Sequence, residues 1–281
     1  MNTTDGYSWT GNGTGMASPL GATAVKGPCL ASIVSKEAEA VWEYRIPEGL
    51  SCDEGMFKAH AHPIVDWHGP DANGTIWHEW QTNDEDFEII NSYERAEEFG
   101  IIFIQGIHYR VFISPAEHGL DLRFTATNLS DQTLHNVDNF PCLAAKSENF
   151  WDNDLERTFI VTEGGMTPLR ETDRGTGDPR RTHFHIPGQR PRRFFGEPFW
   201  GQPSKTKALN GAILRTRIDG KFTIGTAWEN VTEIFHNEDA HHCIHSVATL
   251  GDINPGETKT ACGKIVVVEG SVEEAMGELT D

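Results

Sequence analysis

The sequence predicts a mostly β protein, built as one large antiparallel β-sandwich with a short C-terminal helix. Segments rich in β-branched and aromatic residues recur along the chain, and each ends at Gly, Asn, Asp or Pro. Helical periodicity is scarce before the last residues. The chain has 281 residues, of which 37% are hydrophobic, so a single domain over residues 1–281 with one substantial core is expected.

The clearest strand signal is a hairpin. Residues 101–115 and 120–130 flank the polar turn AEHG, and the second segment alternates apolar and polar side chains. Its apolar positions are Leu120, Leu122, Phe124 and Ala126. Further strands are expected in residues 133–145, 157–165, 213–230, 241–250 and 258–270.

Three segments depart from this pattern. Ser271 is a suitable N-cap for a short final helix that carries two glutamates in its first turn. Residues 1–24 are expected to be a flexible or peripheral N-terminal segment. Residues 170–204 contain seven arginines and five prolines, which predicts a long Arg/Pro-rich loop across one face of the sandwich.

Composition excludes some partners. Acidic residues outnumber basic ones by 42 to 23, and the net charge of -19 opposes contact with a nucleic-acid backbone. No apolar run approaches the roughly 18 residues of a membrane helix. The first residues lack a secretory signal, so we expect a soluble protein that is cytoplasmic, or secreted after removal of a signal peptide. The oligomeric state stays open.

The cysteines do not form a recognisable motif. There are five, an odd number, and no C-x-x-C pair occurs among them. We expect reduced, mostly buried thiols.

Histidines are concentrated in two runs. In FKAHAHPIVDWHG, His60 and His62 point to the same side of an extended strand, about 7 Å apart. With His242 from across a sheet they are candidate ligands for a divalent metal, namely zinc, iron or manganese. The alternative is that His60 and His62 are surface or hydrogen-bonded histidines, in which case no cofactor is required.

The second run is HNEDAHHCIH, residues 236–245. A strand over its end places Cys243 and His245 on one face and His242 on the other, with His236 in the preceding turn. We therefore expect this strand to donate one histidine to a site. A third pair, His183 and His185, is expected to face solvent within the Arg/Pro-rich loop.

Other residue types add a sugar-binding interpretation. Tryptophan rings stack on sugar faces, and arginine binds carboxylates or sulfates through paired hydrogen bonds. The candidate substrate-binding residues are Trp80, Trp200, Trp228, Arg192 and Arg193. Histidine suits acid/base chemistry near neutral pH, and arginine can stabilise an oxyanion. The candidate catalytic residues are His60, His62, His245, Arg110 and Arg157.

Two stretches resemble a known family. LDLRFTATNLSDQTLHNVDNFPCLAA (120–145) is similar to the middle strands of galactose mutarotase-like proteins, and INPGETKTACGKIVVVEG (253–270) resembles their closing strands. GTAWEN and CIHS, within residues 225–246, resemble uncharacterised bacterial members. The resemblance implies a supersandwich fold. The Asn-rich segment and the acid/base pair of aldose epimerases have no counterpart in this chain.

Three functions stay open at this point. The first is a carbohydrate-active enzyme, an epimerase/mutarotase or a lyase, which acts on a sugar or an anionic, uronate-containing saccharide through histidine acid/base chemistry. The second is a metal-dependent, cupin-like enzyme that uses the His-x-His pair. The third is a non-catalytic carbohydrate-binding module.

Overall fold

Alternating side chains arrange the chain into two large β-sheets that share one hydrophobic core. The computed structural model describes residues 7–8, 21–24, 27–28, 30–57, 64–81, 103–173, 180–190, 201–238 and 241–280. Within these residues, Trp42 and Tyr44 from the first sheet and Tyr109 and Phe124 from the second belong to the same buried cluster. The predicted mostly β sandwich is therefore confirmed.

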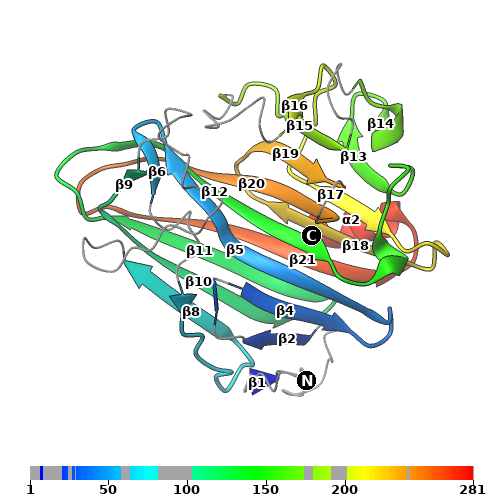
Figure 1. Cartoon of the computed structure of the whole chain (residues 1–281), viewed down its shortest axis with the longest axis horizontal. Coiled ribbons are helices and arrows are strands. Elements are labelled where there is room, and N and C mark those ends of the chain that lie inside the picture. The colour runs from blue at the N-terminus through cyan, green and yellow to red at the C-terminus, as the bar shows by residue number, and fades with distance from the viewer. Residues whose placement is uncertain are drawn as a thin grey trace.

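The larger sheet has eleven strands in the described part of the chain and contains the long strands that matter for function. Figure 1 shows β5, β12 and β20 running next to one another. The main path is β1 (Tyr7–Ser8), β2 (Gly21–Ala24), β4 (Leu30–Ser35), β5 (Ala40–Cys52), β12 (Leu134–Ala145), β20 (Cys243–Ile253), β19 (Val231–Asn237), β15 (Arg181–His185) and β16 (Gln202–Pro203). Strand β6 (Gly55–Phe57) pairs with β5 and with β9 (Phe103–Ile104).

Within the described residues, the second sheet has eight strands, all in antiparallel pairs. Their order is β14 (Gly165–Pro168), β13 (Thr158–Thr162), β17 (Ile213–Thr216), β18 (Phe222–Trp228), β21 (Thr258–Glu269), β11 (Gly119–Asn128), β10 (Ile107–Ala116) and β8 (Ile76–Gln81). A separate two-stranded sheet joins β3 (Gly27–Pro28) and β7 (Ile64–Val65). Two 3-10 turns, η4 (Glu148–Phe150) and η5 (Leu169–Glu171), follow β12 and β14.

Local sequence signals are confirmed where they were strongest. Strands β10 and β11 form the predicted hairpin, and every predicted apolar position of β11 is buried. The C-terminal helix α2 (Val272–Thr280) begins after Ser271. The Glu274 amide donates to Ser271 Oγ at 3.3 Å and the Ser271 amide donates to Glu274 Oε2 at 2.7 Å, a reciprocal capping box. No helix among the described residues has the length and hydrophobicity to cross a membrane.

The Arg/Pro-rich segment is not one loop. Strand β15 lies within it and pairs with β19, so the prediction of an irregular segment over 170–204 is wrong at Arg181–His185. Thr182 and Phe184 are buried on the core side, and this alternation makes the segment a sheet strand despite its composition. The prediction for His236 is also wrong, because this residue lies inside β19 and is fully buried.

Candidate active site

Strand register sets five side chains in one row across the larger sheet. Cys142 lies opposite Arg45 on β5, and the pairing of Leu143 with Ile244, continued by one residue, sets Cys142 opposite His245 on β20. His245 pairs with Phe235, and Phe235 pairs with His183 on β15. The residues next to them in sequence belong to the core shared with the second sheet: Tyr44, Leu143, Ile244, Ile234 and Phe184. The row therefore lies on the outward face of this sheet.

Although it faces away from the second sheet, most of the row is buried. His245 is 1% exposed, and only Arg45 at the end of the row keeps a partly exposed side chain. The Phe235 ring stacks on His183 at 4.3 Å and lies 5.0 Å from His245 between ring centroids. A Cβ at Gly201 would lie 3.0 Å from Phe235 Cε2 and 3.1 Å from His183 Cδ2, so the glycine backbone covers this part of the row closely.

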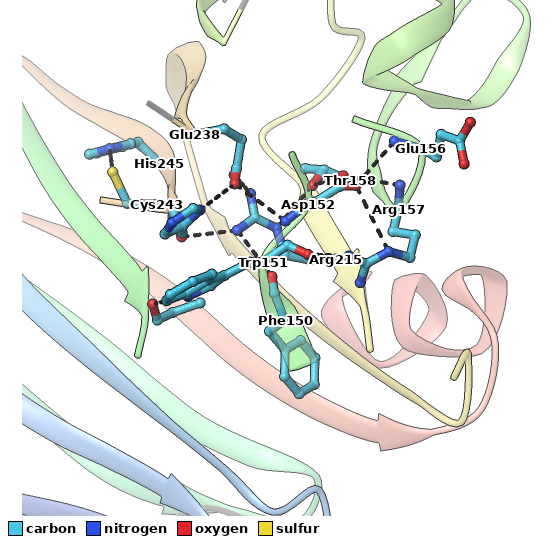
Figure 2. Close-up of polar contacts among 12 residues, drawn as sticks. Phe150, Trp151, Asp152, Glu156, Arg157, Thr158, Arg215, Glu238, Cys243 and His245 are labelled. Atoms are coloured by element: carbon cyan, nitrogen blue, oxygen red, sulfur yellow. Dashed lines mark hydrogen bonds and ion pairs between the residues drawn. The ribbon is translucent and has the colours of Figure 1, made fainter. Parts of the chain in front are cut away.

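Two thiols and an imidazole converge in the middle of the row. Cys243 Sγ lies 3.1 Å from His245 Nε2, as Figure 2 shows. The ligand atoms of Cys142, Cys243 and His245 all lie within 4.8 Å of one another. His245 Nδ1 donates to the Pro141 carbonyl at 2.7 Å, which fixes the proton on Nδ1. A hydrogen bond with Cys243, together with burial, raises the pKa of Cys142 well above its ordinary value.

A carboxylate lies between two imidazoles at the β15 end of the row. Glu233 Oε1 is 3.3 Å from His183 Nδ1, and Glu233 Oε2 is 3.7 Å from His185 Nδ1. Glu233 and His185 pair across β19 and β15, so register alone brings them together. Glu233 is only 1% exposed. This Glu233 triad, comprising Glu233, His183 and His185, is an arrangement able to take up, hold and return a proton.

Arginines flank the row at both ends. Arg45 is paired with Glu48 at 3.4 Å and with Glu43 at 3.9 Å. Glu48 also lies 3.8 Å from His245 Nδ1. Arg181 shares the outward face of β15 with His183 and His185, since the three alternate along one strand. The row therefore has a guanidinium near either end, and that of Arg45 already has two carboxylate partners.

Of the predicted catalytic residues that the structure describes, only His245 belongs to the row. Arg110 lies on β10 in the second sheet, where its half-exposed side chain pairs with Glu79 at 2.7 Å. Arg157 precedes β13 and binds the carbonyl oxygens of Thr216 and Trp151. Neither arginine shares a sheet with His245, so the structure brings neither Arg110 nor Arg157 beside it.

Those of the predicted substrate and metal residues that the structure describes lie outside the row. Trp80 packs against Tyr109 in the second sheet, and Trp228 is a core residue that ends β18. His242 stacks on Trp151 at 4.2 Å and binds Glu238 through Nδ1 at 3.1 Å. The remaining predicted residues lie outside the described part of the chain: His60, His62, Trp200, Arg192 and Arg193.

The register corrects one expectation about the histidines and agrees with another. His183 is buried against Phe235 and does not face solvent. Strand β20 brings Cys243 and His245 together on one face, as expected, and contributes one histidine to the cluster. The signal for both was the alternation in RTHFH and CIH, which places polar groups on one face at every second residue. Cys142 and Glu233 carried no such local signal.

Comparisons with known proteins agree on the fold. No family model and no curated protein matches the chain. A galactose mutarotase-like protein from Lactobacillus casei superposes with a TM-score of 0.51 at 11% identity, over 89% of this chain and 98% of that one. A protein of Synechocystis sp. PCC 6803 gives a TM-score of 0.56 at 10% identity, over 96% and 98%.

A third solved structure is the galactose mutarotase related enzyme from Lactobacillus acidophilus. It superposes with a TM-score of 0.54 at 9% identity, over 95% of this chain and 98% of that one. These superpositions span nearly the whole of both chains, and they confirm the resemblance seen in the strand and turn motifs. The chain has the antiparallel sandwich fold of the galactose mutarotase-like proteins.

Proposed function

We propose that this protein is a carbohydrate-active enzyme that transfers protons on a sugar, and that its simplest reaction is the interconversion of aldose anomers. The observation that carries the proposal is the Glu233 triad, a buried carboxylate held between two imidazoles on one sheet face. The names of two structural neighbours, galactose mutarotase-like and galactose mutarotase related, point to the same chemistry by analogy of fold.

The reaction needs one acid and one base. An imidazolium donates a proton to the ring oxygen while a neutral imidazole removes the proton of the anomeric hydroxyl, so the bond from the anomeric carbon to the ring oxygen breaks and a carbonyl forms. Rotation about the next carbon–carbon bond and ring closure return both protons. Glu233 orients His183 and His185 and stabilises whichever imidazolium forms, a role that acid/base catalysis commonly gives to a carboxylate.

The width of the row suits a sugar ring. His183 and His245 are two strands apart, which corresponds to roughly 10 Å at the spacing of β-strands. Phe235 lies between them, with its ring packed on His183 and beneath Gly201. The flanking arginines make an anionic sugar a suitable substrate, and a uronate would also open the lyase reaction, in which a base removes the proton next to the carboxylate.

Magnetisation-transfer NMR tests the proposal, because it measures anomer exchange directly in a mixture at equilibrium. Neutral aldoses and uronates would each be incubated with the protein and with its Glu233→Gln variant. We expect exchange above the buffer rate with the unmodified protein, and a loss of about 10²-fold or more in the variant. Glu117→Gln, at an exposed turn between β10 and β11, is the matched control and should leave exchange unchanged.

Two other results would contradict anomer interconversion as the reaction. New absorbance near 235 nm with a uronate polysaccharide and no anomer exchange would identify a lyase. Saturable sugar binding without turnover of any substrate would identify a carbohydrate-binding module. Circular dichroism of each variant would establish that a lost activity does not reflect a lost fold.

A further inference from the structure

The convergence of Cys142, Cys243 and His245 has a chemistry of its own, separate from the Glu233 triad. Thiolates and imidazole are the ligands that zinc prefers. Three such groups come from two neighbouring strands and meet on one face. We propose that Cys142, Cys243 and His245 bind one zinc ion, through two sulfurs and Nε2.

The distances between the donor atoms fit a tetrahedral zinc ion. Bonds of about 2.3 Å to sulfur and about 2.0 Å to nitrogen set two sulfurs about 3.8 Å apart, and a sulfur and a nitrogen about 3.5 Å apart. In the structure, Cys243 Sγ and His245 Nε2 are 3.1 Å apart, and all three donor atoms lie within 4.8 Å. Side-chain adjustments of about 1 Å at most between the sulfurs, and slightly more between a sulfur and the nitrogen, therefore complete the geometry.

The surroundings of His245 supply a second, independent observation. A metal-binding histidine nearly always donates its other ring N–H to a carbonyl or a carboxylate, which orients the ring. His245 Nδ1 donates to the Pro141 carbonyl at 2.7 Å, and Glu48 lies 3.8 Å from the same nitrogen. Nε2 is thereby aimed at the two sulfurs. Three protein ligands leave one coordination position, as in catalytic zinc sites.

A disulfide explains the same cysteines less well. The register makes Cys142 and Cys243 diagonal neighbours on adjacent antiparallel strands, and such positions lie roughly 7–8 Å apart between Cα atoms. That separation exceeds the reach of an unstrained disulfide, whose Cα atoms are usually less than about 7 Å apart. An ion between the sulfurs spans the longer distance. A disulfide would also not explain why Nε2 of His245 is directed at the sulfur of Cys243.

Metal analysis tests the proposal without any sugar, so its outcome is independent of the proposed enzyme activity. The reduced protein would be incubated with zinc, passed through gel filtration and analysed for bound metal. We expect one zinc per chain, and X-ray absorption should show two sulfur neighbours and at least one nitrogen neighbour at the bond lengths above. Replacing zinc by cobalt(II) should give the visible bands and the thiolate charge-transfer band of a tetrahedral cobalt–thiolate site.

Single-residue variants locate the ion. Cys243→Ser and His245→Asn should lose the retained zinc, whereas Cys52→Ser and Cys262→Ser, which alter thiols outside the cluster, should keep it. No zinc retained by the reduced protein would overturn the proposal. So would zinc bound equally by all four variants, or a Cys142–Cys243 disulfide in the isolated protein with no metal uptake after reduction. If a variant fails to fold, the X-ray absorption spectrum of the unmodified protein identifies the ligands, since it reports the sulfur and nitrogen neighbours of the zinc ion directly.

Discussion

The buried ion pair between Arg215 and Glu238 gives the most demanding test of how the two sheets are joined. Arg215 on β17 is 2% exposed and Glu238, directly after β19, is 0% exposed. Figure 2 shows the guanidinium surrounded by its acceptors. Besides binding Glu238, it donates to Thr158 Oγ1 and to the His242 carbonyl, each at 2.9 Å. The pair therefore links β17 and β13 of the second sheet to the ends of β19 and β20.

Glu238→Gln keeps the shape of this side chain and removes its charge. The Arg215 cation then stays buried without its carboxylate, and breaking a buried pair in this way costs about 3–5 kcal/mol of unfolding free energy. For a chain of 281 residues, an unfolding entropy of about 2.1 cal/mol/K per residue converts this cost into a Tm decrease of about 5–8 °C. The double variant Arg215→Met/Glu238→Leu removes both charges and should lose less than the single change.

Urea denaturation and calorimetry of the three proteins measure these differences. Glu257→Gln, a partly exposed carboxylate in the turn before β21, serves as the control and should change the unfolding free energy by less than about 1 kcal/mol. A loss below about 1 kcal/mol for Glu238→Gln would refute the reasoning. A double variant clearly less stable than the single one would refute it as well, since the cost is attributed to the unpaired charge.

Two glycine-to-alanine changes should alter protein stability in opposite directions. Gly201→Ala places a Cβ 3.0 Å from Phe235 Cε2 and 3.1 Å from His183 Cδ2, so we expect a loss of about 1–3 kcal/mol in unfolding free energy and slower anomer exchange. Gly277→Ala meets nothing within 4 Å in α2 and should raise thermal stability slightly; equal effects of the two changes would contradict this. Burial lowers the pKa of His78 to about 4. Between pH 6.5 and pH 4, His78 is therefore protonated in the unfolded chain and neutral in the folded protein. Unfolding free energy should therefore fall by up to about 1.4 kcal/mol per pH unit from pH 6.5 down to pH 4, and His78→Gln should flatten that dependence in urea titrations at several pH values.

The elements predicted correctly from sequence are those whose signals are local. The hairpin of β10 and β11 and the capping box of α2 each depend on residues within one short segment. Strand β15 was missed because the arginines and prolines of the surrounding segment, residues 170–204, obscured the alternation of Thr182 and Phe184. Its position is determined by pairing with β19, a partner that the local pattern does not identify.

The site depends still more on pairing between distant strands. Cys142 meets His245 only because β12 and β20 are neighbours in a particular register. Glu233 meets His185 only because β15 joins the edge of β19. The local concentration of histidines in the sequence drew attention to His245. Its neighbours in the site could be identified only once the order of the strands in the sheet was known. A shift of one residue in either register would turn these groups toward the core.

The location of the sugar site is the central claim, and NMR of histidine side chains tests it most directly. The chain has thirteen histidines, and those of the Glu233 triad can be assigned with His183→Asn and His185→Asn. We predict that a bound aldose or uronate shifts the resonances of His183 and His185 in a saturable way. Shifts confined to His108 and His118, which lie in the second sheet and its turn, would contradict the account, as would no shift for any sugar.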